Sequence, residues 1–251
     1  MQALTALDLY ERTVQDPARA VDLLVSRHGG SPRILGEDFA GSAALSRCWV
    51  ERVPGGRAIA VDLDGASLGH APHPLVEAHV LDARSPTLAR LGPCDVVHAG
   101  NFSIGELHAR AEVLGWARSA HARLVHGGIV AVDTYGGESA WRIGALERRR
   151  REHDGSEIRW LWEQRAADPL TAEVVNALSF RVLWKDEVVI DRPDAFVYRW
   201  RLWSVPEIID VLREAGFAAV DAHTRLDALA PGVPEDPAVH AGCVALVTGR
   251  K

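Results

Sequence analysis

Two arrangements of apolar residues follow each other along the chain. Between residues 33 and 132, short apolar runs alternate with segments in which apolar residues recur every three or four positions. The runs cover 33–35, 58–61, 78–81, 95–99 and 128–132, and the helical segments cover 41–51 and 105–121. Strands of this length separated by helices form βαβ units. We therefore expect an α/β fold with a doubly wound, mostly parallel sheet and helices on both of its faces.

The ends of the chain complete this domain. Helical spacing from Leu7 to Val25, interrupted by Pro17, indicates an N-terminal helical segment within residues 1–30. Near the other end, a helix is expected over 205–215 with Ser204 as its N-cap. Two strands, 218–223 and 243–248, follow it and are joined by a Pro-rich loop. One domain of residues 1–251 is the economical interpretation.

Residues 137–203 follow a different pattern, which indicates an antiparallel insert after the fifth strand. Its strands are expected at 158–165, 173–184, 187–190 and 195–203. Lys185-Asp186 is predicted to form a tight turn between the second and third of these strands.

The charge balance narrows the classes of partner. The formal net charge of −6 gives no global attraction to bulk nucleic acid or to an anionic membrane. No apolar stretch approaches the roughly 18 residues that a membrane span needs. Arg148 to Arg151 form the one basic cluster, and the acids Glu147 and Glu152 beside it favour a solvated helix face over a phosphate-binding patch. We expect a cytoplasmic monomer or homodimer.

Neither a metal site nor a disulfide framework is predicted. The three cysteines lie far apart in the sequence, as expected for small apolar residues in a reducing compartment: Cys48, Cys94 and Cys243. The histidines are scattered without metal-ligand spacing.

Acidic residues stand at the ends of the first three predicted strands: Glu37, Asp62 and Asp82. In a doubly wound sheet the ligand lies outside the carboxyl ends of the strands. Glu37 suits an ammonium group, Asp62 can accept hydrogen bonds from both hydroxyls of a ribose, and Asp82 can accept one from the adenine amine. Each acid taken singly is also explained as a turn residue. Their joint order matches one adenosyl amino acid.

The loop after the first strand argues against a dinucleotide. Residues 37–43 contain one glycine, Gly41, where the pyrophosphate cradle of a dinucleotide fold needs three. The acid at the start of the loop would also repel a phosphate. An NAD-dependent oxidoreductase is therefore disfavoured.

The same segments resemble those of a known family. Residues 37–43, 61–64 and 81–83 look like motifs I, II and III of class I S-adenosylmethionine (SAM)-dependent methyltransferases, in the subgroup whose first loop reads E-D-F-C-G-T-A. Phe39 and Ala43 stand where glycines are usual. The resemblance implies SAM as cofactor, S-adenosylhomocysteine as product, and a cofactor-binding role for these residues: Tyr10, Glu37, Phe39, Ala40, Gly41, Asp62, Leu63, Asp82, Ala83, Asn101 and Phe102.

The fourth and fifth strands end in residues that would face the transferred methyl group. The segment 99–103 is similar to the G-N-S-F segment of glycine N-methyltransferase-like enzymes, which implies that Asn101 orients the acceptor and that Phe102 walls the cofactor. A plain strand-to-helix turn is the alternative. Asp133 is a candidate proton acceptor or ammonium anchor, with a turn at Gly136-Gly137 as its alternative. The catalytic candidates are Asn101, Asp133 and Tyr135.

The insert is expected to be a lid that shapes the acceptor pocket. It is rich in aromatic and Arg residues, and the substrate-binding candidates are Tyr198, Arg199, Trp200 and Arg201. Residues that alternate along a strand face opposite sides, so either Tyr198 and Trp200 or the two arginines line the pocket. Arginines there would favour an acceptor with a carboxylate. Packing of the aromatic residues onto the core is the alternative.

The sequence thus predicts an enzyme that transfers the methyl group of SAM to a small-molecule acceptor, with an amine nitrogen as the preferred nucleophile. Such a reaction needs alignment more than acid and base groups, because the methyl group is already activated. Protein or RNA methylation on the same fold, and a catalytically silent SAM-binding module, are the alternatives.

Overall fold

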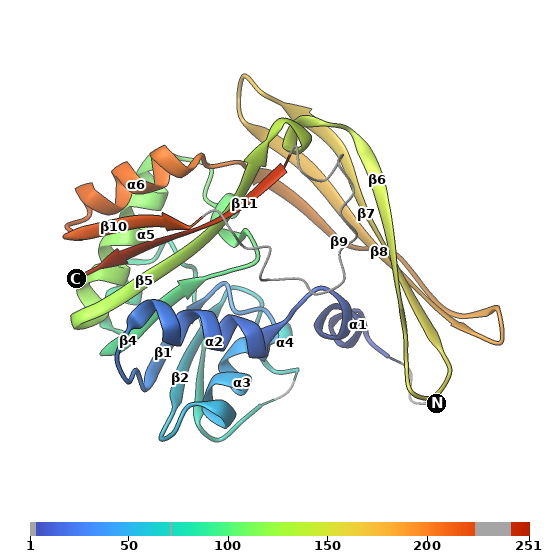
Figure 1. Ribbon diagram of the computed structural model, residues 1–251, viewed down its shortest axis with the longest axis horizontal. Coiled ribbons are helices and arrows are strands. Elements are labelled where there is room, and N and C mark those ends of the chain that lie inside the picture. Colours follow the sequence, from blue (N-terminus) through green and yellow to red (C-terminus); the bar gives the residue numbers. More distant parts are fainter. Residues whose placement is uncertain (1–3, 71, 224–241) are drawn as a thin grey trace.

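The computed structural model describes residues 4–70, 72–223 and 242–251. These residues form a mixed seven-stranded sheet flanked by helices and a separate four-stranded antiparallel sheet (Figure 1). The expected Pro-rich loop between the last two strands lies outside the described residues.

The large sheet has the strand order β10-β11-β5-β4-β1-β2-β3. All neighbouring strands pair in parallel except at β11, which runs antiparallel to both β10 and β5. The strands are β1 (Ile34–Asp38), β2 (Arg57–Asp62), β3 (Val76–Val80), β4 (Cys94–Ala99), β5 (Leu124–Gly137), β10 (Ala219–His223) and β11 (Gly242–Arg250). The predicted doubly wound, mostly parallel sheet is confirmed.

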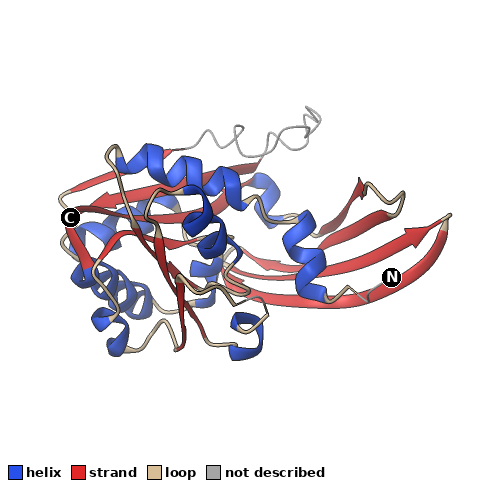
Figure 2. Cartoon of the chain, turned by 90° about the horizontal axis from the view of Figure 1, so that it is seen from below, coloured by secondary structure: helices blue, strands red, loops and turns tan. Residues whose placement is uncertain are grey.

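Helices cover both faces of this sheet, as Figure 2 shows. On one face α5 (Arg110–Arg123) and α6 (Val205–Glu214) bury residues such as Trp116 and Leu212 against β1, β4 and β5. On the other face α2 (Pro17–His28) and α3 (Ala44–Arg52) pack Leu24 and Trp49 against the same strands. The remaining helices are short: α1 (Ala6–Thr13), α4 (Gly65–Leu68), η1 (Pro86–Arg90), η2 (Ser103–Glu106) and η3 (Glu138–Trp141).

Local sequence signals fix several of these boundaries. As expected, two helices lie on either side of a break before Pro17, which is the first residue of α2. Proline is well tolerated at this position, because the backbone N–H that it lacks would have no partner within the helix. Ser204 caps α6 and shares a capping box with Glu207. The expected helix 105–121 instead begins at Arg110, because residues 103–106 form the 3₁₀ turn η2.

The insert forms the antiparallel sheet β6-β7-β8-β9, which projects from the α/β body (Figures 1 and 2). Its strands are β6 (Gly144–Arg151), β7 (Glu157–Asp168), β8 (Glu173–Trp184) and β9 (Glu187–Arg201). The predicted turn at Lys185 and Asp186 is confirmed, with φ of 51° and 65°. The two strands expected at 187–190 and 195–203 are one strand, β9, with irregular pairing to β8.

One prediction about the insert was wrong. Arg148 to Arg151 do not lie on a helix but in the exposed edge strand β6, which pairs with β7. These four consecutive arginines show no alternation of apolar and polar residues that would distinguish a helix from a strand. Charged residues on an edge strand oppose pairing with another chain.

Candidate active site

The carboxyl ends of β1 and β4 mark the candidate site. These strands are neighbours in the sheet, and the chain leaves them in opposite directions, which makes this the switch point of the fold. The loops that follow hold four non-glycine residues in the left-handed region, with φ of 56° to 62°: Phe39, Ala43, Asn101 and Phe102. Such strained backbone concentrates at functional sites. The predicted first and fourth loops therefore meet at one edge.

Glu37 is a buried carboxylate at the end of β1. Its Oε2 accepts hydrogen bonds from the backbone nitrogen of Ser46, at 2.8 Å, and from the Ser46 hydroxyl. Burial raises the pKa of Glu37 to about 7. No described residue donates to Oε1, and a role for this oxygen in binding an ammonium group stays a prediction.

Asp38, the next residue, has a structural role on the opposite face of β1. It forms an ion pair with Arg123 of α5, and neither side chain has any exposed surface. The indole nitrogen of Trp116 also donates to it, at 2.8 Å. Of the two adjacent acids, only Glu37 has an oxygen without a donor among the described residues.

Asp62 organises the first loop from the end of β2. Its Oδ2 accepts from the backbone nitrogen of Gly41 at 2.7 Å, and its Oδ1 accepts from that of Asp64 at 2.8 Å. Asp62 is only half-buried, and Leu63 beside it is 65% exposed. Asp64 instead caps α4 by accepting from the backbone nitrogen of Ala66. The two acids thus differ in role.

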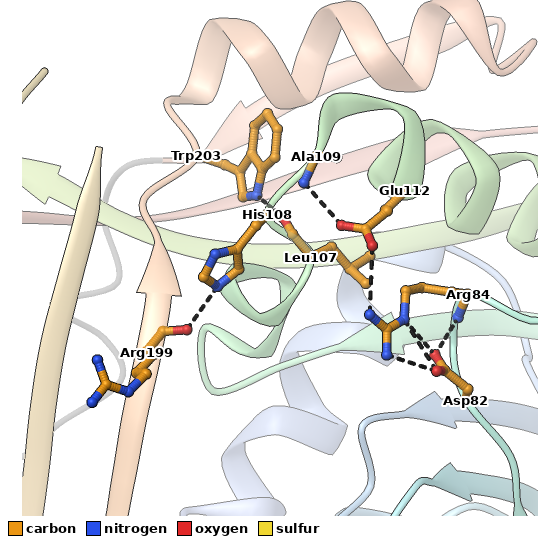
Figure 3. Close-up of polar contacts among 8 residues, drawn as sticks. All are labelled: Asp82, Arg84, Leu107, His108, Ala109, Glu112, Arg199 and Trp203. Carbon is orange, nitrogen blue, oxygen red and sulfur yellow. Dashed lines mark hydrogen bonds and ion pairs between the residues drawn. The ribbon is translucent and has the colours of Figure 1, made fainter. Parts of the chain in front are cut away.

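Asp82 follows β3 and is held by an arginine. The Nη2 atom of Arg84 lies 2.7 Å from Oδ2 of Asp82, and Arg84 also contacts Glu112 of α5 (Figure 3). These bonds with Arg84 lower the pKa of Asp82. Ala83 is buried beside it. Arg84 makes four hydrogen bonds to the Asp82 carboxylate, and adenine recognition by Asp82 stays a prediction.

The structure gives Asp133 a positioning role. Its Oδ2 accepts from the backbone nitrogen of Asn101 at 2.9 Å, and its Oδ1 from that of Phe102 at 2.7 Å. Both carboxylate oxygens therefore hold the left-handed turn after β4, although burial raises the pKa of Asp133 to about 6. The role of Asp133 as a proton acceptor or ammonium anchor stays a prediction. The alternative turn at Gly136-Gly137 is absent, since β5 runs through both residues.

An aromatic cluster lies between this turn and the insert. We use the name for Phe102, Tyr135, Trp162, Tyr198 and Trp200. The ring centroids of Phe102 and Tyr135 are 4.8 Å apart, and those of Tyr198 and Trp200 stack at 4.5 Å. Trp200 also contacts Trp162 and packs on Gly105, where a Cβ would lie 2.8 Å from its side chain. Packing therefore explains much of the aromatic content of the insert.

Helix α1 joins the α/β body to the insert (Figure 1). Glu11 pairs with Arg47 at 2.7 Å, and Arg47 also donates to the carbonyl of Ser42 in the first loop. On the insert side, the ring of Tyr10 packs edge-on against that of Phe196, with centroids 5.2 Å apart, in the same apolar cluster as Tyr198. Burial raises the pKa of Tyr10 to about 12. Tyr10 thus lies between the first loop and the aromatic cluster.

Strand register places the two pairs of insert candidates on opposite faces of β9. Tyr198 and Trp200 belong to the aromatic cluster. Arg199 is exposed, and its carbonyl is hydrogen-bonded to His108 at 2.8 Å (Figure 3). Arg201 lies over the ring of Trp203, 3.8 Å from its centroid. The role of Arg199 and Arg201 in binding an acceptor carboxylate stays a prediction, and both lie on the face of β9 opposite to the aromatic cluster.

Two polar residues that the sequence did not single out also contact the cluster. Glu106 accepts a hydrogen bond from the indole nitrogen of Trp200 at 2.7 Å. Asn176 is fully buried and donates to the Tyr135 hydroxyl at 3.2 Å, while its Oδ1 has no partner among the described residues. The presence of an asparagine inside the apolar run of β8 was a signal that could have pointed to Asn176.

The fold is shared with known methyltransferases. DesVI of Streptomyces venezuelae is 19% identical with a TM-score of 0.73, over 98% of this chain and 96% of DesVI. A sugar N-methyltransferase from Streptoalloteichus is 18% identical with a TM-score of 0.68, over 100% of this chain and 96% of its own. A SAM-bound amino pentose methyltransferase from Micromonospora echinaspora, involved in calicheamicin biosynthesis, is 15% identical with a TM-score of 0.71, over 99% of this chain and 98% of its own.

No protein-family model and no curated protein matches the sequence. The structural likeness confirms the Rossmann-like methyltransferase fold that the resemblance implied. Within the described residues, no cluster of three or more His, Cys, Asp or Glu residues is placed to hold a metal ion. None of the helices in this part of the chain is long and apolar enough to cross a membrane.

Proposed function

We propose that the chain is an enzyme that binds SAM and transfers its methyl group to an amine nitrogen of a small molecule. The observation that carries this proposal is the set of strand-end carboxylates Glu37, Asp62 and Asp82 beside the strained loops after β1 and β4. The fold of the chain, which is also that of SAM-dependent methyltransferases, supports it.

In this proposal each acid contacts one part of the cofactor. Oε1 of Glu37 binds the ammonium group, Asp62 the ribose hydroxyls and Asp82 the adenine amine. Ala40 and Gly41, held by Asp62, let the backbone approach the methionine part. Phe39, Leu63, Ala83 and Phe102 supply apolar contacts.

The acceptor side is built for alignment. SAM supplies a methyl group that is already activated, so the chain must hold the nucleophile in line and keep water out. Asp133 fixes the turn that carries Asn101 at the mouth of the site. Tyr135 and the other aromatic residues form an apolar wall opposite. Residues 137–203 are the proposed lid on this side.

The class of acceptor is an amine, and amino sugars are the first to test. Two structural neighbours are described as a sugar N-methyltransferase and an amino pentose methyltransferase. Stacked aromatic rings such as Tyr198 and Trp200 suit both a protonated amine and the apolar face of a sugar ring. A cytoplasmic location, and a monomer or homodimer without nucleic-acid or membrane partners, complete the proposal.

The test is incubation of the chain with methyl-labelled SAM and a panel of amines that includes aminohexoses and aminopentoses, followed by incubation with a metabolite extract. The proposal predicts label in a product that is heavier than its acceptor by one labelled methyl group in place of one hydrogen on nitrogen. Label in hydroxyl-only acceptors, protein or RNA would contradict the amine. Binding of SAM without transfer to any acceptor would indicate a silent module.

A further inference from the structure

Glu106 is an acidic group at the acceptor side that the cofactor does not use in the proposed function. It ends η2, four residues after the turn that Asp133 holds, and it is exposed. Its Oε1 accepts the hydrogen bond from Trp200 at 2.7 Å, which fixes the carboxylate against the aromatic cluster. Among the described residues nothing donates to Oε2, so this oxygen is available to a ligand.

A row of contacts connects Glu106 to the turn after β4. The indole of Trp200, which donates to Glu106, has its ring centroid 6.2 Å from that of Phe102. Phe102 belongs to the turn whose backbone nitrogens donate to Asp133. Glu106, Trp200 and Phe102 therefore border one region, with Asn101 at its edge.

Glu106 is the more accessible acid in this region. Each oxygen of Asp133 already accepts from a backbone nitrogen, whereas Glu106 is exposed and its Oε2 accepts from no described residue. The arginines Arg199 and Arg201 lie on the face of β9 opposite to Tyr198 and Trp200, away from the aromatic cluster. Another acceptor, the buried Oδ1 of Asn176, has no partner among the described residues, and the amide nitrogen of the same side chain donates to the Tyr135 hydroxyl.

We infer that Glu106 determines specificity for a cationic acceptor by pairing with its ammonium group against the face of the aromatic cluster. A carboxylate and stacked indole and phenol rings both attract a cation. The inference rests on the proposed function, because it assigns the acceptor end of that same site. Glu106 would hold the protonated amine on arrival, and the amine loses its proton to solvent before it attacks the methyl group.

The test uses the indole N–H of Trp200 as a reporter, because this group is bonded to Glu106. Chain labelled with ¹⁵N and saturated with S-adenosylhomocysteine is titrated with isopropylammonium, or with isopropanol as its neutral isostere, at constant ionic strength. The Trp200 signal is assigned by its loss in Trp200→Phe. Glu106→Gln keeps an oxygen for the indole bond but removes the charge, and Glu187→Gln removes an exposed charge at the far hairpin as the matched control.

The inference predicts that isopropylammonium shifts the Trp200 signal to saturation and that isopropanol does not. Glu106→Gln should weaken the ammonium affinity about five-fold, the upper end for an exposed ion pair, while Glu187→Gln leaves it unchanged. Equal shifts with isopropanol, no shift with the ammonium, or unchanged affinity in Glu106→Gln would overturn it. The titration is repeated without S-adenosylhomocysteine. The same outcomes then test the role of Glu106 even if the chain does not bind the cofactor.

Discussion

Replacing Asp62 by alanine tests the cofactor site most selectively. The Asp62 carboxylate accepts from the backbone nitrogens of Gly41 and Asp64, at 2.7 and 2.8 Å, and remains half-exposed. In the proposed complex it also accepts from the ribose hydroxyls. The Asp62→Ala variant loses both the ligand bonds and the anchor that keeps Gly41 in place. We therefore expect weaker SAM binding.

The size of the effect follows from the bonds removed. Hydrogen bonds to a charged carboxylate contribute about 1.5–3 kcal/mol, and water replaces part of that at a half-exposed site. A loss of about 1–3 kcal/mol corresponds to a dissociation constant raised about 5- to 150-fold. Calorimetric titration of SAM into both proteins measures it directly.

Asp64→Ala provides the matched control, since Asp64 caps α4 and lies two residues away. Loss of an N-cap costs about 1 kcal/mol of folding stability and should leave SAM affinity nearly unchanged. Equal losses of SAM affinity at both positions, or a larger loss in Asp64→Ala, would refute the assignment of Asp62 to the ribose.

Three further predictions concern other parts of the site. The pKa of Glu37 is about 7 in the folded chain and 4.5 in an unfolded chain, so the folded state holds this proton more strongly. The free energy of unfolding of the wild type, relative to that of Glu37→Gln, should therefore fall as the pH rises from about 4.5 to about 7. Urea-unfolding free energies of the two proteins that run parallel with pH would contradict this. Asp38→Asn leaves the Arg123 charge buried without its partner and should lower the free energy of unfolding by about 3 kcal/mol or more in urea titrations, whereas a loss below about 1 kcal/mol would show that the pair is not buried in solution. Tyr198→Ala should lower turnover of an amine acceptor with little change in SAM affinity, while Arg199→Ala on the outer face changes neither; abolished SAM binding in a folded Tyr198 variant would reject the lid.

The fold followed from sequence where periodicity was clear. Apolar runs between residues 33 and 132 mark the mostly buried strands β1, β2, β4 and β5 and the more exposed β3, and the helices between them show the apolar spacing of one covered face. Strand β6 was not predicted, because its consecutive arginines show neither the helical nor the strand period of apolar residues. The single strand β9 was predicted as two strands that leave out residues 191–194, which contain no apolar run, although its pairing with β8 continues past an irregularity there.

The sequence predicted which acids lie at the ends of strands, but not which residues they contact. Acids at strand ends are visible in a sequence because every parallel strand delivers its last residue to one edge. Which partner each acid has depends on residues far along the chain: Asp38 meets Arg123, and Asp133 meets the backbone of the turn after β4. The face of β9 that carries Tyr198 depends on strand register, which a single sequence does not fix.

Calorimetric titration of the chain with SAM, S-adenosylhomocysteine and NAD tests the central claim most directly. The strand-end acids and the glycine-poor first loop predict that SAM and S-adenosylhomocysteine each bind at one site per chain and that NAD does not bind. Binding of NAD without binding of SAM would contradict the account.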